Sequence, residues 1–186
     1  MKAVGIVGSP RKGGNTEILV THCLKAIAEE GIKTEIIRLA GLKISGCIDC
    51  GHCHKHQGEC SVKDDMQAVR AKMVEADAII IGTPVYFGAA TALVRGLMER
   101  AAFCERGGLS GKVGGPIVVA RRAGQNFTFA EMNFWFYLNG ITTPAGTYWN
   151  MAVGREKGEV EKDEEGMMTV WNFGKNVARV AKKLKD

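Results

Sequence analysis

Four of the six cysteines lie in one short loop, as Cys47-x2-Cys50-x2-Cys53-x6-Cys60, and their spacing suits a metal centre. Thiolates at two-residue intervals let one turning segment place three sulfurs around a cubic cluster, and the longer arm can fold back to supply the fourth. The spacing therefore favours a [4Fe-4S] cluster held by all four cysteines. Such a centre carries single electrons, which predicts an electron-transfer function.

Three other interpretations of this loop stay open. Zinc is one, because His52, His54 and His56 are also potential ligands, although typical zinc sites separate two ligand pairs by a dozen or more residues. A cysteine-lined loop without metal is another. The third is covalent haem, because residues 50–54 read C-x-x-C-H. The histidines themselves are either solvated or tune a bound centre through hydrogen bonds.

A second motif, Gly-Ser-Pro-Arg-Lys-Gly-Gly-Asn-Thr at 8–16, precedes a predicted helix and is suited to binding a phosphate. Gly14-Asn15 stands where a Walker loop needs Lys-Ser/Thr, which argues against triphosphate hydrolysis. The chain also lacks Gly-x-Gly-x-x-Gly, and Arg38 replaces the acidic residue expected for a dinucleotide. A terminal monophosphate such as that of FMN fits better, and a plain turn with a helix cap is the alternative.

Two further loops follow apolar strands. Residues 83–88, Thr-Pro-Val-Tyr-Phe-Gly, offer a flat apolar wall and backbone amides, which a flavin ring needs, although an ordinary strand-to-helix connection would look similar. Residues 121–126 form the third loop, in which Arg121 and Arg122 either pair with an anionic group or lie on the surface.

The elements that must position these loops alternate between strand and helix. Strands are predicted at 4–7, 34–39, 77–82, 116–120 and 141–148, and Asp64 is predicted to cap the helix that ends near 76. This alternation predicts one α/β domain over 1–186, a doubly wound parallel sheet of flavodoxin-like order 2-1-3-4-5, with the cysteine loop at 45–63 after the second strand. Ligands then lie at the carboxyl ends of the strands.

Composition limits the remaining classes. Cys23 and Cys104 fall on apolar helical stripes and are predicted to be core thiols, so a disulfide framework and a secreted protein are disfavoured. The N-terminal apolar stretch is too short for a signal peptide or a membrane span. We therefore expect a cytoplasmic protein. The net charge of +5 comes from scattered residues, so neither nucleic acid nor a membrane is an expected partner.

The motifs at 8–16 and 82–88 together resemble those of the NADPH-dependent FMN reductase group of flavodoxin-like proteins. With the cysteine loop added, the chain is similar to the iron–sulfur flavoproteins of anaerobic archaea and bacteria, over nearly its whole length. The resemblance implies FMN and a [4Fe-4S] cluster as cofactors. It implies that the FMN phosphate is held by Ser9, Arg11, Asn15 and Thr16, and that the isoalloxazine is lined by Pro84, Val85, Tyr86, Phe87 and Gly88, with Gly124 on another side.

Two functions follow from these expectations. One is an electron carrier that takes electrons from ferredoxin and passes them to a redox protein or a small oxidant. The other is an NAD(P)H-dependent FMN or quinone reductase without a working cluster, and a flavin-binding redox sensor is a more distant third. The aromatic segments 127–129 and 134–137 are either the interface of a homodimer or homotetramer or an ordinary core helix.

Overall fold

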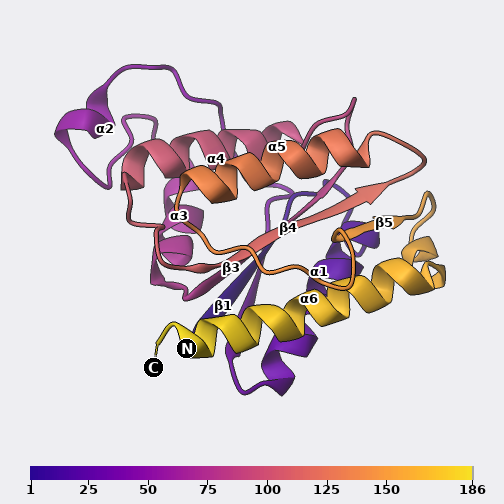
Figure 1. Ribbon diagram of the computed structural model, residues 1–186. Helices are drawn as coiled ribbons and strands as arrows, with labels where there is room; N and C mark the ends of the chain where they lie inside the picture. Colours follow the sequence, from indigo (N-terminus) through magenta and orange to yellow (C-terminus); the bar gives the residue numbers. More distant parts are fainter. Residues whose placement is uncertain (186) are drawn as a thin grey trace.

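The computed structural model describes residues 1–185. Five parallel strands form one sheet in the order β2-β1-β3-β4-β5, which confirms the predicted flavodoxin-like fold (Figure 1). The strands are β1 (Lys2–Val7), β2 (Lys33–Arg38), β3 (Ala78–Pro84), β4 (Val113–Ala120) and β5 (Met151–Val153). The helices are α1 (Asn15–Glu29), α2 (His52–Lys55), α3 (Met66–Glu75), α4 (Ala92–Glu105), α5 (Gln125–Leu138), α6 (Glu164–Lys183) and a 3-10 turn η1 (Glu159–Lys162).

The helices cover both faces of the sheet, with α1 and α6 on one face and α3, α4 and α5 on the other (Figure 1). Alternate residues of β3 show the division, because Ile80 packs with α1 and α6 whereas Ile79 and Ile81 pack with α3 and α4. A strand covered on both faces needs apolar side chains at every position, which explains the continuous Ile79-Ile80-Ile81 run. Cys23 and Cys104 are buried in these two cores, as predicted.

The predicted fifth strand at 141–148 is wrong. Only Thr142 reaches the sheet, through an isolated bridge to Val113, and β5 forms further along the chain beside Val118 to Ala120. Pro144 has no N–H for a strand ladder, and the residues around it are mostly exposed, so this segment crosses the end of the sheet as a connection. As a result, the carboxyl end of β5 and the loop after it lie at Gly154 rather than at the end of the predicted segment 141–148.

Most other boundaries agree with the sequence to within a few residues. The predicted cap of α3 is one residue off, because Asp65 occupies the N-cap position and makes no side-chain cap hydrogen bond. Asp64 lies just before it, and its Oδ1 accepts a hydrogen bond from the Met66 N–H (3.1 Å). The short helix α2, inside the cysteine loop, and the turn η1 were not predicted. Among residues 1–185, no helix is both long and apolar enough to cross a membrane.

Candidate functional site

The glycine-rich loop joins β1 to α1 at the carboxyl end of the sheet. Ser9 Oγ accepts a hydrogen bond from the Arg11 N–H (3.2 Å), which tightens the turn. Gly14 occupies the N-cap position of α1 and has no side chain to accept hydrogen bonds from the first helical turn. The N–H groups of that turn have no intrahelical partners, so this end of α1 is suited to an anion.

The carboxylate of Glu17 anchors the glycine-rich loop. It accepts hydrogen bonds from the Arg38 Nε (2.7 Å) and from the Gly13 N–H (2.7 Å). The Arg38 guanidinium, with help from the Gly13 N–H and against the opposite effect of burial, lowers the pKa of Glu17 below its ordinary value. The ionised carboxylate therefore fixes the loop and leaves the helix N-terminus facing the pocket.

The loop after β5 lies against the phosphate loop. Asn15 Nδ2 donates to the Glu156 carbonyl (2.9 Å), Asn15 Oδ1 accepts from the Gly158 N–H (2.9 Å), and Arg11 Nη1 donates to the Arg155 carbonyl (3.3 Å). The amide of Asn15 therefore has protein partners, so that residue acts first by positioning residues 154–158 beside the pocket. This contact between the loops after β1 and β5 was not predicted, because the fifth strand was expected at 141–148.

Residues 84–89 form a tight hairpin turn beside the same pocket. Tyr86 and Ala89 exchange backbone hydrogen bonds (2.9 and 3.1 Å), and Phe87 (φ 54°) and Gly88 (φ 79°) occupy the turn with positive φ. Gly124 (φ 90°) packs on this turn, since a Cβ there would lie 3.0 Å from Val85 Cγ1. Phe87 is fully exposed and Tyr86 is about half exposed.

A cavity of about 340 Å³ lies between these loops. It brings together most of the residues predicted for FMN, while Phe87, Gly88 and Gly124 lie beside it. Arg121, whose role the sequence left open, also lines it, and the sequence missed its other walls. The lining residues are Ser9, Arg11, Asn15, Thr16, Pro84, Val85, Tyr86, Val119, Arg121, Gly154, Arg155 and Glu156. The lining combines cations and amides with apolar groups, which suits a ligand with a phosphate and a ring.

The cysteine loop builds a second pocket, against α4. Cys47 and Cys50 are exposed, Cys53 and Cys60 are half-buried, and all four line this one pocket. Its other walls include Arg100, Phe103 and Cys104 of α4. Four thiols on one pocket are the donor set that an iron–sulfur cluster requires, so the residues fit that group by chemistry.

The ligand groups themselves are not drawn together. Within residues 1–185, no three Cys, His, Asp or Glu side chains are close enough to hold a metal ion. Cys50 Sγ lies 2.9 Å from Ser61 Oγ, and that hydroxyl and the backbone N–H of His52 lower the pKa of the Cys50 thiol. The thiolate is the form of cysteine that binds metals, and these hydrogen bonds favour it.

Cys104 differs from the four loop cysteines, although it lines the same pocket. Burial, with the nearby Cys60 and Cys53, raises the pKa of the Cys104 thiol to about 11. Its Sγ donates to the Glu59 carbonyl (3.6 Å), and its own carbonyl accepts from the Gly58 N–H (3.0 Å). Cys104 therefore docks the long arm of the loop as a neutral thiol.

The stem of the loop rests on α4 one turn earlier. The Cys47 N–H donates to Glu99 Oε2 (3.3 Å), and a Cβ at Gly96 would lie 2.8 Å from the Ser45 carbonyl oxygen. Residues 96, 99, 100, 103 and 104 recur at three- and four-residue intervals and share one face of the helix. Apart from Cys104, this face was not predicted, because its other residues do not belong to the apolar stripe that the sequence indicates for α4.

The three histidines take different positions on the loop. The rings of His52 and His56 stack with centroids 4.4 Å apart, and His52 Nε2 lies 3.7 Å from Glu59 Oε2. His54 lines the cysteine pocket.

Comparison of the sequence with known proteins identifies its family. A family model for NADPH-dependent FMN reductase matches residues 1–153. An iron–sulfur flavoprotein of Methanocaldococcus jannaschii is 42% identical over all of both chains. One from Methanosarcina thermophila is 33% identical, with 97% of this chain and 95% of the relative covered.

Solved structures share the fold at low sequence identity. RosB with a bound flavin-phosphate intermediate has a TM-score of 0.77 at 20% identity, covering all of this chain and 80% of that one. A WrbA-like flavodoxin from Agrobacterium tumefaciens has a TM-score of 0.70 at 18% identity, with 98% of each chain covered. These likenesses concern the fold of the chain alone.

Proposed function

The chain belongs to the NADPH-dependent FMN reductase family, and on this premise we propose that it is an FMN-dependent electron-transfer flavoprotein with a [4Fe-4S] cluster. It would relay electrons between a low-potential donor such as ferredoxin and a redox protein or small oxidant, in the cytoplasm. The observation that carries the proposal is that all four loop thiols line one pocket, in a fold whose second pocket is lined by cations, amides and apolar groups.

FMN is assigned to the pocket at the carboxyl ends of the strands. The uncapped N-terminus of α1, Arg11 and Arg121 would hold the phosphate, and Pro84, Val85 and Tyr86 would lie against the ring. Cys47, Cys50, Cys53 and Cys60 would hold the cluster. When bound, the cluster supplies one-electron chemistry and FMN one- or two-electron chemistry, so the protein could join donors and acceptors of different electron number.

The two pockets lie at different places along α4. Helix α4 begins near the carboxyl end of β3, beside the flavin pocket, whereas the cysteine pocket is lined by Arg100, Phe103 and Cys104 of α4. At 1.5 Å per residue, Arg100 and Cys104 lie roughly 12–18 Å along the helix from its start. Figure 1 shows the cysteine loop projecting from one corner of the fold. We propose that transfer between the two centres is completed across a homodimer or homotetramer.

Metal analysis and spectroscopy of the anaerobically purified protein test this proposal. We expect flavin bands with about four irons and four acid-labile sulfides per chain, and loss of iron and sulfide in Cys50→Ala with flavin retained. Cys23→Ala is the matched control, because it removes a buried core thiol and should retain the iron. Zinc in place of iron, or iron retained in Cys50→Ala, would contradict the assignment.

A second candidate is an NAD(P)H-dependent FMN or quinone reductase without a working cluster. The observation that favours it is the spread of ligand groups, since no three of them are gathered for a metal within the described chain. Reduction of bound FMN by NADPH, with equal rates in wild type and Cys50→Ala, would support this reductase. Reduction by ferredoxin that is lost in Cys50→Ala would support the electron carrier.

A further inference from the structure

Arg100 is a buried cation in the middle of α4, with its side chain only 1% exposed. A charge removed from water is costly unless it is paired and all its donors are hydrogen-bonded. Its position in the sequence, Met98-Glu99-Arg100-Ala101-Ala102, gives no sign of this environment. The groups around the guanidinium therefore indicate the role of Arg100.

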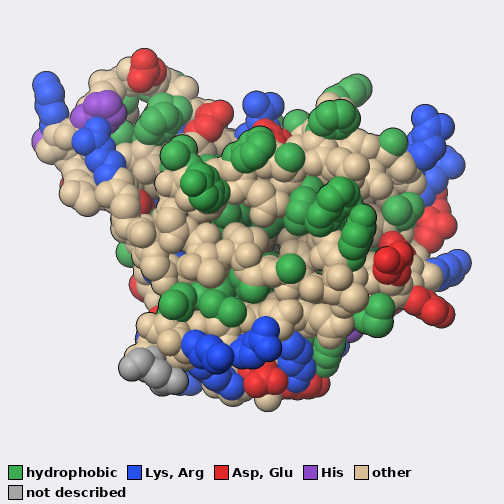
Figure 2. Space-filling model, in the orientation of Figure 1, with side chains coloured by type: hydrophobic (Ala, Val, Ile, Leu, Met, Phe, Trp, Pro, Cys, Tyr) green, Lys and Arg blue, Asp and Glu red, His purple; other side chains and the backbone are tan. Residues whose placement is uncertain are grey.

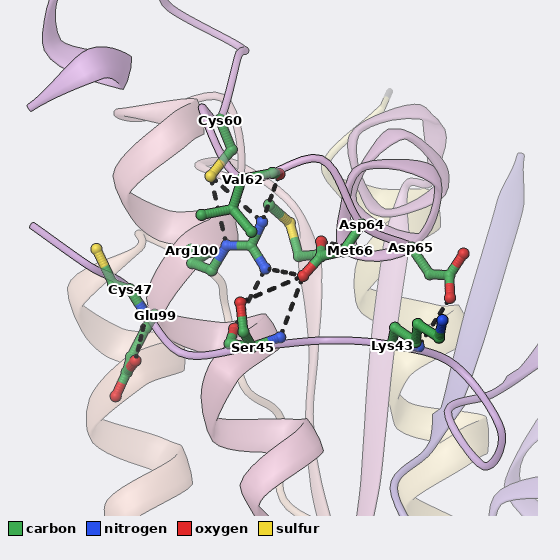
Figure 3. Close-up of polar contacts among 10 residues, drawn as sticks. All are labelled: Lys43, Ser45, Cys47, Cys60, Val62, Asp64, Asp65, Met66, Glu99 and Arg100. Carbon is green, nitrogen blue, oxygen red and sulfur yellow. Dashed lines mark hydrogen bonds and ion pairs between the residues drawn. The ribbon is translucent and has the colours of Figure 1, made fainter. Parts of the chain in front are cut away.

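The guanidinium makes five contacts, equal to its number of N–H donors, and Figure 3 shows that they converge from both stems of the cysteine loop. Nε and Nη2 both donate to Cys60 Sγ, at 3.4 and 3.3 Å. Nη2 also donates to the Val62 carbonyl (3.0 Å). Nη1 donates to the Ser45 carbonyl (3.2 Å) and to Asp64 Oδ2 (2.6 Å). The edge of the guanidinium formed by Nε and Nη2 thus faces the Cys60 sulfur.

Asp64 completes the arrangement on the opposite edge. Its Oδ2 also accepts from the Ser45 N–H (3.1 Å), so one carboxylate and one guanidinium join the segments before Cys47 and after Cys60. A carboxylate alone would suffice to neutralise the buried charge. The two N–H···S contacts are not needed for charge pairing. They direct the Arg100 guanidinium towards Cys60, one of the predicted cluster ligands.

We propose that Arg100 is a positioning residue that fixes Cys60 as a cluster ligand and raises the reduction potential of the cluster. The inference rests on the proposed function. A cluster with four thiolates becomes more negative when it gains an electron, so a buried cation and N–H donors at a ligand sulfur stabilise the reduced form more than the oxidised form. Hydrogen bonds to the sulfurs are among the features that set such potentials.

Redox titration of the holoprotein by electron paramagnetic resonance tests this role. In Arg100→Gln, which loses the charge, we expect the ratio of reduced to oxidised cluster at a fixed potential to fall at least tenfold, a shift of 59 mV or more for one electron. Arg100→Lys keeps the charge and can still pair with Asp64, but it lacks the fork, and we expect a smaller shift in the same direction. Arg95→Gln is the matched control, because Arg95 is an exposed arginine of the same helix paired with Glu131.

The outcomes separate the possible roles. A purely structural arginine would lower iron content or stability but leave the potential of the remaining clusters unchanged. If Arg100→Gln holds neither iron nor FMN, it has not folded, and Arg100→Lys decides the question. Potentials in the Arg100 variants equal to wild type would overturn the inference while leaving the cluster in place. Wild-type protein without iron would overturn the proposed cluster itself, and the role of Arg100 with it.

Discussion

Arg11 is the residue whose charge most directly serves the proposed phosphate site. It lines the flavin pocket, whereas its neighbour Lys12 does not. Arg11→Gln should weaken FMN binding by about tenfold to a hundredfold, since a hydrogen bond to a charged group contributes roughly 1.5–3 kcal/mol. Riboflavin has no phosphate, so its weaker binding should change little. Fluorescence titration of apoprotein with both ligands measures this difference.

Lys12→Gln removes the same charge from the same loop and serves as the control for Arg11→Gln. Its FMN affinity should remain close to wild type. Equal losses in the two variants would mean that only the general positive charge of the loop matters. Equal losses for FMN and riboflavin in Arg11→Gln would place the phosphate elsewhere.

Glu17 links the phosphate loop to stability and to pH. Its folded pKa lies below the ordinary value of 4.5, so the stability it contributes is present above the unfolded pKa and is lost as pH falls through the folded pKa. Glu17→Gln should lower the free energy of unfolding by about 1–2 kcal/mol near pH 7. The difference between variant and wild type should begin to shrink as pH falls below the unfolded pKa and disappear only once pH is below the lowered folded pKa.

Urea unfolding of both proteins between pH 3.5 and 7 measures the effect of Glu17. A difference that stays constant over this range would show that the ionisation of Glu17 is not coupled to folding. A variant that is more stable at pH 7 would reverse the sign and rule out the ion pair with Arg38 as its basis.

Residues differ in how much of their role a sequence reveals. The four loop cysteines were found because ligand types at short, regular spacing are visible without a fold. Arg100 was not found, because one arginine among apolar helical residues looks like any exposed arginine until the loop is placed over it. Arg155 and Glu156 were missed for a different reason, since they join the pocket only through the position of β5.

At the scale of elements, local patterns determined most of the sheet. Buried central strands are recognisable because both of their faces are apolar, as in β3. The edge strand β5 has only three residues, and its sequence has no comparable signal, so the longer apolar stretch at 141–148 was preferred. Residues 151–153 form β5 because they pair with β4. Pairing of an edge strand depends on tertiary contacts, which the periodicity of the sequence does not indicate.

Gly96 tests whether α4 is the platform of the cysteine loop. Alanine usually stabilises a helix relative to glycine by about 1 kcal/mol. Here the added Cβ would lie 2.8 Å from the Ser45 carbonyl oxygen, which is backbone and moves at a cost of roughly 1–3 kcal/mol. Gly96→Ala should therefore lower the melting temperature and the iron content while FMN content stays unchanged.

Ala102→Gly is the control for this experiment, because it weakens the same helix without adding an atom near Ser45. It should lower the melting temperature and retain the iron. If Gly96→Ala is instead more stable than wild type and keeps its iron, the loop stem is free to move away from α4, and the platform has no role in holding the cluster.

The whole molecule presents an apolar surface on the side of α5. Phe127, Phe134, Tyr137 and Leu138 of α5 are all more than 70% exposed, and Tyr148 and Trp149 on the following segment are about half exposed. Figure 2 shows hydrophobic side chains spread across this face, whereas lysines and arginines gather below, over α6. The sequence left a core helix and an interface as alternatives, and α5 combines a buried stripe with an exposed aromatic one.

We expect a second copy of the chain to cover this aromatic surface, because transfer between the centres is proposed to be completed by another subunit and exposed aromatic patches of this kind mark interfaces. Phe134, 71% exposed, is the residue to change. Phe134→Glu should lower the mass measured by sedimentation equilibrium towards that of one chain. Met168→Glu, at an exposed position on α6, should keep the wild-type mass. A wild-type monomer, or a Phe134→Glu variant with the wild-type mass, would show that this surface does not join subunits, and transfer between centres would then need a partner protein or a route within one chain.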